Sequence, residues 1–322
     1  MTTSPDVAVC VSTRNRVDRL RRLLAQLERQ TLPADRFEVV VVDDGSADTT
    51  WQVLEQQAAA GPLQLRPLRN DESAGPAAGR NRAWRAARAP LVAFTDDDCM
   101  PSPTWLQAGV AAMSQQPVLA AGAIRPTRED EARLGPFSRF LIADAGIAVW
   151  CATANLFIRR EHLEHSGGFD ESFRNAAGED TDLGLRITGV GVPFVFLPEA
   201  VVYHDVERSS LLGLIRDQRR WADVAAVIAR HPEARRLLLH RRYFWKPTHP
   251  KLLLLLVGAA AAARRPAALA LAVPWVHERT CAQPRVETVG ENLAVLAGTL
   301  AVDCAELIAM VRGSIRHRTL VL

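Results

Sequence analysis

The first hundred residues alternate between short apolar runs and segments whose apolar residues recur at helical spacing. The apolar runs predict four β-strands, at residues 7–11, 37–42, 63–68 and 91–95. The intervening segments predict three helices, at residues 17–30, 48–60 and 77–87. The run at 37–42 is apolar at every position except Glu38, which is typical of a strand buried on both faces of a parallel sheet. This alternation predicts an α/β fold with right-handed crossovers.

The mixture of strands and helices continues to residue 204 in a less regular form. Helices are predicted at residues 103–113, 161–166 and 178–189. Strands are predicted at residues 152–159, 192–196 and 201–204. Residues 125–133 are polar and predict a surface loop.

Beyond residue 204 the pattern becomes helical, basic and apolar. Residues 211–228 carry apolar side chains along one helical face and arginines away from it, which predicts an amphipathic basic helix. Residues 252–263 form an apolar run of only twelve residues, whereas a spanning helix needs about 20. This run is either a buried core helix or a re-entrant or interfacial hairpin. A true span is disfavoured, because a longer run would enclose Arg264 and Arg265. Residues 291–312 predict a further apolar helix.

Composition and charge narrow the class of protein. The chain has 322 residues, of which 48% are apolar and 23% charged, and this excludes a disordered or fibrous protein. The net charge is +3, but residues 208–251 hold eleven basic and three acidic side chains, so this block is +8 and the rest is −5. Such a block indicates contact with an anionic surface or a solvated helical face. Nucleic acid is disfavoured as the partner, because the block carries no reader motif.

The cysteines and the N-terminus bear on the compartment. The five cysteines are far apart and form no CxxC pair, so neither a disulfide framework nor a zinc site is predicted. The first ten residues lack the features of a secretory signal. We therefore expect a reducing, cytoplasmic compartment.

Two acidic clusters follow predicted strands at the edge where α/β sheets bind ligands. Asp96 and Asp98, two residues apart in an extended segment, point the same way and would share Mg²⁺ or Mn²⁺. Alternatively, this cluster caps the helix that follows. The second cluster begins at Asp43 and Asp44 and runs through Gly45 into a turn. Together the clusters predict a site for a nucleotide with a metal-bound diphosphate.

The loop after the first strand excludes two common nucleotide-binding folds. It reads Ser12-Thr13-Arg14-Asn15, where a dinucleotide-binding Rossmann fold would have GxGxxG, and it has no P-loop glycines.

Four ordered motifs resemble a known family. They are VAVCVSTRN, VVVVDDGSADTT, GPAAGRNRAWRAARAPLVAFTDDDCMPSPTWL, and NLFIRREHLEHSGGFDESF followed by GEDTDLGLR. Together they resemble the inverting glycosyltransferases of family 2 over roughly residues 7–204. The resemblance implies the GT-A fold of nucleotide-diphospho-sugar transferases, with a Rossmann-like, mostly parallel sheet. It also implies a divalent metal, Mn²⁺ or Mg²⁺.

The resemblance assigns a role to most of the polar residues at the strand ends. The implied nucleotide-sugar site comprises Ser12, Thr13, Asn15, Asp44, Arg80, Asp96 and Asp97. Arg14 stands where relatives more often have an aromatic residue. Asp44 would contact the base, Arg80 the base or the phosphates, and Asp96 the ribose and the sugar. Asp98 would hold the metal.

A histidine after the last strand joins the metal shell in some relatives, and here that residue is His204. A structural hydrogen bond is the competing interpretation of His204. Trp150 and Asn155 lie in the segment that faces sugar and acceptor in the family, although a core tryptophan explains Trp150 equally well. Asp217 stands where the QxxRW motif of processive relatives needs glutamine, so processive synthesis is disfavoured.

The family's catalytic base corresponds to Asp180, next to Glu179, whose charge would raise the pKa of the base. A first-turn acid favoured by the helix dipole is the alternative for Asp180. Asp182 competes for the role of base, but it lies four residues before Arg186 and is explained as a helix ion pair.

These residues predict a metal-dependent inverting glycosyltransferase that moves a sugar from a nucleotide-diphosphate sugar to an acceptor hydroxyl. The acceptor would be lipid-linked or a cell-surface glycan precursor, and the enzyme peripheral at the cytoplasmic face of an anionic membrane. Residues 1–207 would form the GT-A domain, with the nucleotide half to about 100 and the acceptor half from 101. Residues 208–322 would form a helical extension. The alternatives are a sugar-phosphate nucleotidyltransferase and a non-catalytic module that binds membranes or partners.

Overall fold

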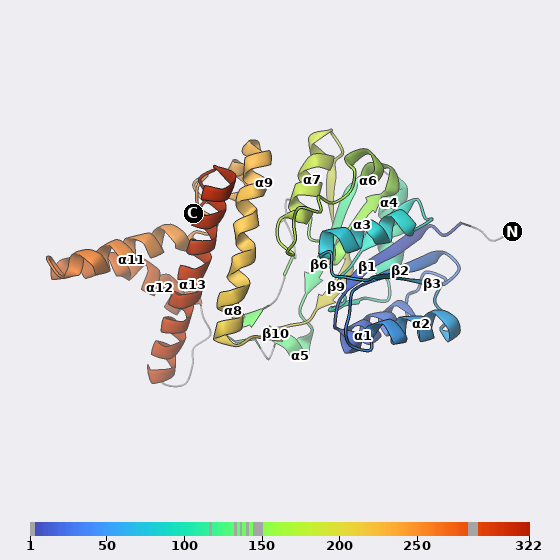
Figure 1. The fold of residues 1–322 in the computed structure, drawn as a ribbon, viewed down its shortest axis with the longest axis horizontal. Helices are drawn as coiled ribbons and strands as arrows, with labels where there is room; N and C mark the ends of the chain where they lie inside the picture. The colour runs from blue at the N-terminus through green and yellow to red at the C-terminus, as the bar shows by residue number, and fades with distance from the viewer. Residues whose placement is uncertain are drawn as a thin grey trace. The chain divides into compact units, whose positions relative to one another are not determined.

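The computed structural model describes residues 4–115, 118–131, 134–135, 137–139, 142–143, 151–282 and 289–322. The chain divides into two compact units. Figure 1 shows the first in blue to yellow and the second in yellow to red, apart from a short green segment of the second at residues 137–139. Unit 1 comprises Met1–Ala132 and Phe140–Val206, and unit 2 comprises Arg133–Arg139 and Glu207–Leu322.

Unit 1 is built on an eight-stranded mixed sheet in the order β3-β2-β1-β4-β8-β6-β9-β5. The strands are β1 (Val7–Thr13), β2 (Phe37–Asp44), β3 (Leu65–Asn70), β4 (Leu91–Phe94), β5 (Cys99–Pro101), β6 (Leu119–Arg125), β8 (Leu156–Arg159) and β9 (Phe194–His204). The pairs along β3-β2-β1-β4 are parallel, as is β6 with β9. β8 and β5 run antiparallel to their neighbours. The predicted α/β class and mostly parallel sheet are confirmed.

Helices cover both faces of this sheet (Figure 1). One face is covered by α1 (Val17–Leu27), α2 (Thr50–Ala60) and α4 (Trp105–Gln115), and the other by α3 (Pro76–Ala86), α6 (Arg160–Ser166) and α7 (Glu179–Gly189). Since successive side chains of a strand point to opposite faces, Val7 and Val9 of β1 join the first core and Ala8 and Cys10 the second. Burial on both faces explains why these strands read as continuous apolar runs.

The observed elements of unit 1 differ from the sequence predictions in several places, and the strands β5 and β6 were not predicted. The predicted strand 152–159 starts with a 3₁₀ turn, η1 (Thr153–Asn155), before β8. The two strands predicted at 192–196 and 201–204 are one strand, β9, whose pairing with β6 shifts between Gly122 and Ala123. The predicted loop 125–133 contains a short helix, α5 (Arg128–Glu131).

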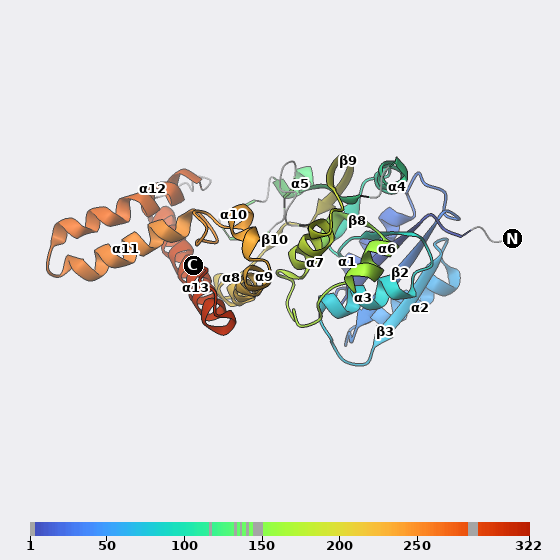
Figure 2. The ribbon, with the colours of Figure 1, turned by 90° about the horizontal axis from the view of Figure 1, so that it is seen from above.

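The described part of unit 2 consists mainly of helices, with a two-stranded ribbon of β7 (Ser138–Arg139) and β10 (Glu207–Arg208). Its helices are α8 (Leu211–Asp217), η2 (Gln218–Asp223), α9 (Val224–Arg230), η3 (Pro232–Ala234), α10 (Arg235–Leu238), α11 (Thr248–Ala262), η4 (Pro266–Ala272), α12 (Val273–Ala282) and α13 (Val289–His317). The predicted helix 211–228 is therefore broken into α8, η2 and the start of α9. In Figure 2, α11 and the returning segment of η4 and α12 run side by side as a hairpin.

One described helix is long and apolar enough to cross a membrane, over Asn292–His317 of α13. Length and composition alone do not separate such a helix from a core helix. Its middle carries Asp303 and Glu306, both buried, and Asp303 forms an ion pair with Arg279 of α12 at 2.6 Å. α13 is thus packed against other helices of its own unit along this side.

Candidate active site

The ends of β1 and β2 are joined by a network of turn residues. The Asn15 backbone N–H donates to Ser46 Oγ at 2.9 Å, and the Ala47 N–H donates to Asn15 Oδ1 at 2.7 Å. Asn15 has a φ of 53°, a left-handed conformation that asparagine tolerates better than most residues. Gly45 has a φ of 72°, and a Cβ there would lie 3.0 Å from the Ser73 nitrogen. The turn therefore requires glycine at this position.

Asp44, at the end of β2, accepts four hydrogen bonds. The donors are Asn70 Nδ2 at 2.7 Å, Ser73 Oγ at 2.7 Å, and the backbone nitrogens of Ala74 at 2.9 Å and Gly75 at 3.0 Å. Burial by itself raises the pKa of Asp44, but these hydrogen bonds outweigh it and hold the pKa below its ordinary value. Asp44 is therefore a carboxylate that fixes the loop leading into α3.

Ser12 and Thr13 connect β1 to two other elements. A Cβ on Gly79 of α3 would lie 2.1 Å from Ser12 Oγ, so the glycine permits close approach of helix and strand. Thr13 Oγ1 donates to Asp97 Oδ2 at 2.7 Å. Ser12 thus packs against α3, and Thr13 ties β1 to the acidic segment after β4.

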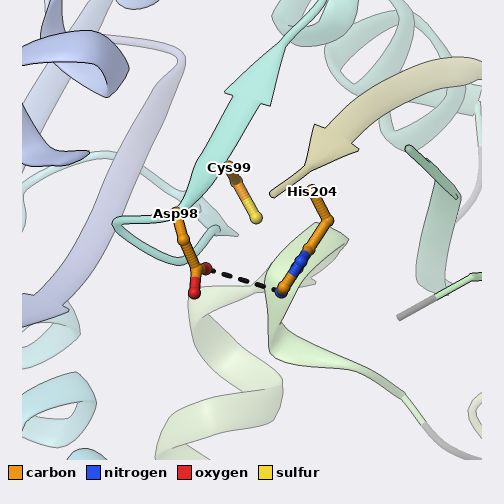
Figure 3. Close-up of side chains that lie close together, drawn as sticks. All are labelled: Asp98, Cys99 and His204. Carbon is orange, nitrogen blue, oxygen red and sulfur yellow. Dashed lines mark ion pairs between the residues drawn. The ribbon is translucent and has the colours of Figure 1, made fainter. Parts of the chain in front are cut away.

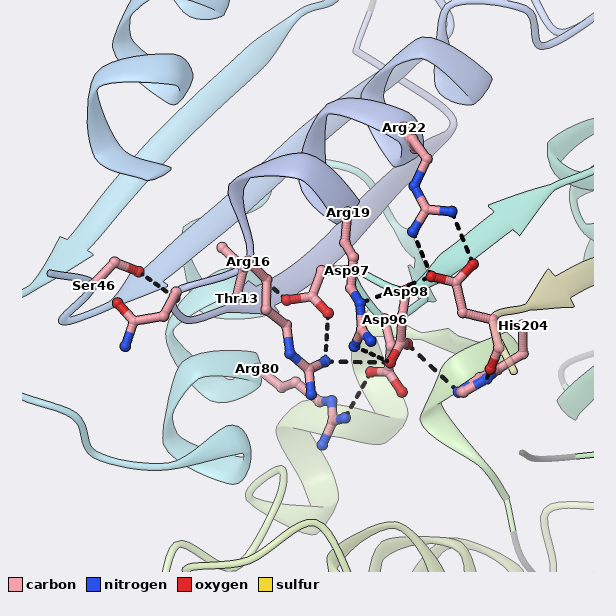
Figure 4. A network of polar contacts seen from close by, with 12 residues as sticks. Thr13, Arg16, Arg19, Arg22, Ser46, Arg80, Asp96, Asp97, Asp98 and His204 are labelled. Carbon is pink, nitrogen blue, oxygen red and sulfur yellow. Dashed lines mark hydrogen bonds and ion pairs between the residues drawn. The ribbon is translucent and has the colours of Figure 1, made fainter. Parts of the chain in front are cut away.

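Arg16, just before α1, and Arg19 of α1 reach this acidic segment, as Figure 4 shows. Arg16 Nη1 lies 2.8 Å from Asp97 Oδ1 and 3.2 Å from Asp98 Oδ2, and Arg19 Nη1 lies 3.4 Å from Asp98 Oδ2. Burial raises the pKa of Asp97 to about 6, against the lowering effect of Arg16. Asp97 is thereby held by β1 and α1, whereas its neighbours Asp96 and Asp98 contact other groups.

The arginines of α1 did not emerge from the sequence reasoning. Arg16 at the N-cap of α1 and Arg19 and Arg22 within the helix recur every three residues, and this spacing was the available signal. Arg22 pairs with Asp205, the residue after β9, with Nη1 3.0 Å from Oδ1. The face of α1 that carries these arginines therefore compensates the acids at the ends of two strands.

Arg80 of α3 bridges two carboxylates from distant parts of the chain. Its Nη2 lies 2.8 Å from Asp96 Oδ1, and its Nη1 lies 2.9 Å from Glu179 Oε1. Burial would raise the pKa of Asp96, but the charge of Arg80 lowers it overall. For Glu179, burial outweighs Arg80 and raises the pKa. The bridge thus connects the end of β4 with the start of α7.

Asp180 follows Glu179 in the first turn of α7, and its carboxylate accepts the Thr181 N–H at 2.7 Å. Burial and the charge of Glu179 raise the pKa of Asp180 to about 8. Asp182, in contrast, pairs with Arg186 at 2.9 Å, and the predicted helix ion pair is confirmed. Asp180 therefore has the properties of a group that exchanges a proton near neutral pH, whereas the carboxylate of Asp182 is engaged by Arg186.

Asp98, Cys99 and His204 form a cluster that fits a divalent metal (Figure 3). One ligand atom from each lies within 4.8 Å of the others, and Cys99 is paired with His204 in the register of β5 and β9. Asp98 Oδ1 is buried without a hydrogen-bond partner among the described residues and lies 3.5 Å from His204 Nε2.

The hydrogen bond of His204 also suits a role as a metal ligand. Its Nδ1 lies 2.9 Å from the Asp205 carbonyl oxygen. Because a carbonyl only accepts, the proton of a neutral imidazole belongs on Nδ1, which leaves Nε2, on the side of Asp98, as the nitrogen that would bind a metal. An imidazole and a carboxylate are suitable ligands for Mn²⁺. Burial raises the pKa of the Cys99 thiol, which makes Cys99 the weakest ligand of the three.

The two residues expected on the acceptor side have a different outcome. Trp150 lies outside the described residues. Asn155 is fully buried, accepts a hydrogen bond from Trp105 Nε1 at 2.8 Å, and donates to the carbonyls of Ala123 at 2.9 Å and Ala200 at 2.7 Å. Because its amide is fully used inside the protein, the structure favours a structural role for Asn155 over contact with an acceptor.

The structure thus gathers most of the predicted site residues at the carboxyl edge of the parallel strands. Thr13, Asp97, Asp98 and His204 form one polar network through Arg16. Arg80 joins Asp96 to Glu179 in a second network. Asp180 adjoins it at the start of α7.

Known proteins resemble the chain in sequence. The model of glycosyl transferase family 2 matches residues 8–179. Glycosyltransferase AglE of Haloferax volcanii is 29% identical over 63% of this chain and 67% of its own length. Validoxylamine A glucosyltransferase of Streptomyces hygroscopicus is 29% identical over 61% of this chain and 54% of its own length. Pre-mycofactocin glycosyltransferase of Mycobacterium tuberculosis is 30% identical over 71% of this chain and 48% of its own length. The match spans about half the length of the last two relatives.

Solved structures resemble the fold. The mannosyltransferase PcManGT from Pyrobaculum calidifontis, in complex with GDP-Man and Mn²⁺, has a TM-score of 0.61 at 23% identity and covers 97% of this chain and 88% of its own. Residues 1–349 of TarS from S. aureus, in complex with UDP, have a TM-score of 0.53 at 18% identity and cover 97% of this chain and 92% of their own. At this identity the likeness concerns the fold, which is GT-A. The family match covers more than half of the chain, and the chain therefore belongs to glycosyl transferase family 2, a family of glycosyltransferase enzymes.

Proposed function

We propose that unit 1 transfers a sugar, with inversion, from a nucleotide-diphosphate sugar to an acceptor hydroxyl. The observation that carries the proposal is the position of Asp180, whose pKa is raised to about 8, beside the bridge of Glu179, Arg80 and Asp96. Two of the solved structures with this fold contain GDP-Man or UDP, which supports a nucleotide-sugar donor.

The donor would lie along the strand ends, in the order of the strands. Asp44 and the loop at Asn15 would face the base, with one hydrogen bond to Asp44 exchanged for a bond to the base. Asp96, whose pKa is lowered beside Arg80, would accept hydrogen bonds from the ribose and sugar hydroxyls. Arg80 would place positive charge beside the phosphates. Thr13 and Arg16 hold Asp97, so we assign Asp97 to support of the site rather than to donor contact.

Asp98 and His204 would hold Mn²⁺ or Mg²⁺. When bound, the ion would neutralise the diphosphate that leaves the sugar. Arg16 and Arg19 already neutralise part of the charge of Asp98. Both arginines would therefore remain beside the phosphates as a second source of positive charge.

Asp180 would act as the general base. The acceptor oxygen forms a bond to the anomeric carbon, the bond from that carbon to the diphosphate oxygen breaks, and the acceptor proton passes to the Asp180 carboxylate. A pKa of about 8 makes this carboxylate a stronger base than an exposed aspartate. Glu179 would contribute through its charge and through its bond to Arg80.

We assign residues 208–322 to a separate extension and place the enzyme at the cytoplasmic face of a membrane. The basic block at residues 208–251 and the apolar helices of unit 2 support this location and a lipid-linked acceptor. The alternative of a sugar-phosphate nucleotidyltransferase gains no support from a base placed as Asp180 is.

The test is a screen of nucleotide sugars with Mn²⁺ or Mg²⁺ that measures release of nucleoside diphosphate in the presence of candidate acceptors. Asp180→Asn should abolish transfer and retain donor binding. Asp182→Asn, on the same helix, is the matched control and should keep transfer at a similar level. Asp98→Ala should lose the metal-dependent part of donor binding. Equal transfer rates in Asp180→Asn and the wild type would refute the assignment of the base.

A further inference from the structure

Residues 254–274 form a helical hairpin that is apolar on nearly all sides. Of these 21 residues only Arg264 and Arg265 are charged, and both lie at the turn between α11 and η4. The structure describes the whole segment, and Gly258 is its one buried residue. Six large apolar side chains are between 37% and 62% exposed: Leu254, Leu256, Val257, Leu269, Leu271 and Val273. Contiguous exposed apolar surface of this kind marks a binding site.

The hairpin is a packed element and not a loose segment. A Cβ on Gly258 would lie 2.5 Å from the Ala268 carbonyl oxygen and 3.0 Å from Leu271 Cβ, so the two limbs approach closely. At its base, Leu252 and Trp275 join a buried cluster with Leu307 of α13. Trp275 Nε1 also donates to Asp303 at 2.9 Å. The exposed limbs therefore project from a fixed base.

The base itself is held by buried charges. Lys246 Nζ lies 2.7 Å from Glu306 Oε1, and Arg279 Nη2 lies 2.6 Å from Asp303 Oδ1. These pairs place the two acids of α13 inside unit 2, which disfavours a free membrane span by α13. The hairpin is consequently the better candidate for contact with lipid.

The distribution of apolar residues identifies the occupant of this surface. A helix that is apolar all round occurs in a protein core or in lipid, whereas a helix that docks on a protein has one apolar face and one polar face. Neither limb of the hairpin has a polar face between residues 254 and 263 or between 266 and 274. A hydrocarbon environment meets this requirement better than a groove on a partner.

The positions of Arg264 and Arg265 indicate how deeply the hairpin lies in the bilayer and which lipid headgroups it contacts. The twelve residues 252–263 rise about 18 Å as a helix, which is too short for a hydrocarbon core of about 30 Å. Insertion with the turn first would bring Arg264 and Arg265 towards the bilayer centre, which is costly. Placement in the plane of the interface keeps both arginines, and Lys251 at the other end of the run, at the level of the phosphates.

We propose that the hairpin of residues 254–274 docks unit 2 on an anionic phospholipid membrane, with its leucines in the acyl boundary and Arg264 and Arg265 at the phosphates. This proposal does not depend on the transfer reaction, and it would bring the enzyme to a lipid-linked acceptor.

The experiment is sedimentation of the full chain with vesicles of phosphatidylcholine alone and of phosphatidylcholine mixed with phosphatidylglycerol. The wild type should bind the anionic vesicles, and added salt should weaken the binding. Val257→Gln with Leu269→Gln should lower the partition coefficient at least tenfold. Val190→Gln, which changes an 80% exposed valine of unit 1, should leave it unchanged. Arg264→Gln with Arg265→Gln should lower binding to anionic vesicles about tenfold and remove most of the salt dependence.

Circular dichroism of each variant controls for folding, since all changed side chains are exposed. The proposal is overturned if the wild type does not sediment with anionic vesicles at low salt. It is also overturned if the glutamine variants sediment like the wild type. Light scattering tests the alternative that the hairpin binds a second copy of the chain instead of lipid. A wild-type dimer that becomes monomeric in Val257→Gln with Leu269→Gln, without vesicle binding, would assign the hairpin to self-association. Transfer activity in detergent reports on the proposed function separately.

Discussion

The replacement of Arg80 by methionine tests whether the buried bridge between α3, β4 and α7 stabilises unit 1. Methionine keeps an unbranched apolar stem of similar shape and removes the guanidinium. Two carboxylates then lose a partner at 2.8 and 2.9 Å. Removal of one partner of a buried ion pair costs about 3–5 kcal/mol. Without Arg80, the partly exposed Asp96 can be solvated by water, and Glu179, whose pKa is already raised, can take up a proton. We therefore expect a loss of stability at the lower end of this range.

The stability lost in Arg80→Met should depend on pH, and the pKa shift of Asp96 determines how. Arg80 holds the pKa of Asp96 below its ordinary value, so the stability from this ion pair is present above the unfolded pKa of 3.8 and is lost as the pH falls through the folded value. Below that pH the wild type keeps a buried arginine without an ionised partner. The difference between wild type and Arg80→Met should therefore be largest near pH 7 and should shrink below about pH 4.

Urea denaturation followed by circular dichroism measures the free energy of unfolding at pH 7 and at pH 3.5. A loss of about 3 kcal/mol corresponds to a fall in Tm of about 6–12 °C for a unit of this size. Arg85→Met is the matched control, since Arg85 lies on the same helix and its pair with Glu171 is half-exposed, which is worth about 0–1 kcal/mol. The reasoning is refuted if Arg80→Met and Arg85→Met lose equal stability at pH 7.

Three further changes test other parts of the site. Asp180→Asn should stabilise the metal-free protein by about 1–3 kcal/mol at pH 9 and by little at pH 4. The reason is that the stability from a carboxyl whose pKa rises from 3.8 to about 8 on folding is lost as the pH rises through 8. Thermal unfolding in EDTA that shows no such gain would contradict the raised pKa of Asp180. Gly79→Ala should cost about 1–3 kcal/mol, since its Cβ would lie 2.1 Å from Ser12 Oγ, and a double-mutant cycle should show that Ser12→Gly recovers most of the loss. Asn155→Leu should cost at least about 3 kcal/mol because it leaves two buried carbonyls and the Trp105 N–H unpaired; a raised KM for the acceptor with unchanged stability would instead place Asn155 on the acceptor side.

Local patterns in the sequence were sufficient for the α/β class of unit 1 and for its first four strands, but not for β5 and β6. The runs at residues 39–42 and 91–94 are apolar because both faces of β2 and β4 are buried, and carboxylates follow each run at the end of its strand. Hydrophobic period and chain order are local properties, so they predict the strands, the crossovers and the edge that carries the acids. The boundaries of β9 were harder to predict, because Pro198 and Glu199 interrupt the alternation of apolar and polar residues within one strand.

The contacts within the candidate site depend on residues far apart in the chain. Arg80 and Glu179 are separated by 99 positions, and Arg16 and Asp97 by 81. The sequence named Asp98 and His204, but only the pairing of β5 with β9 brings them to 3.5 Å. Likewise, burial turned Asn155 from an expected acceptor contact into a structural residue.

The sequence by itself therefore determined the class of fold, the motifs of the family and the two acidic strand ends. It also indicated a short apolar run followed by two arginines. The tertiary structure decided which cation faces which acid, which aspartate has a raised pKa, and that the apolar hairpin of unit 2 is exposed. The physical reason is that secondary structure follows from side chains a few positions apart, whereas pKa shifts, ion pairs and exposure depend on neighbours that only the folded chain brings together.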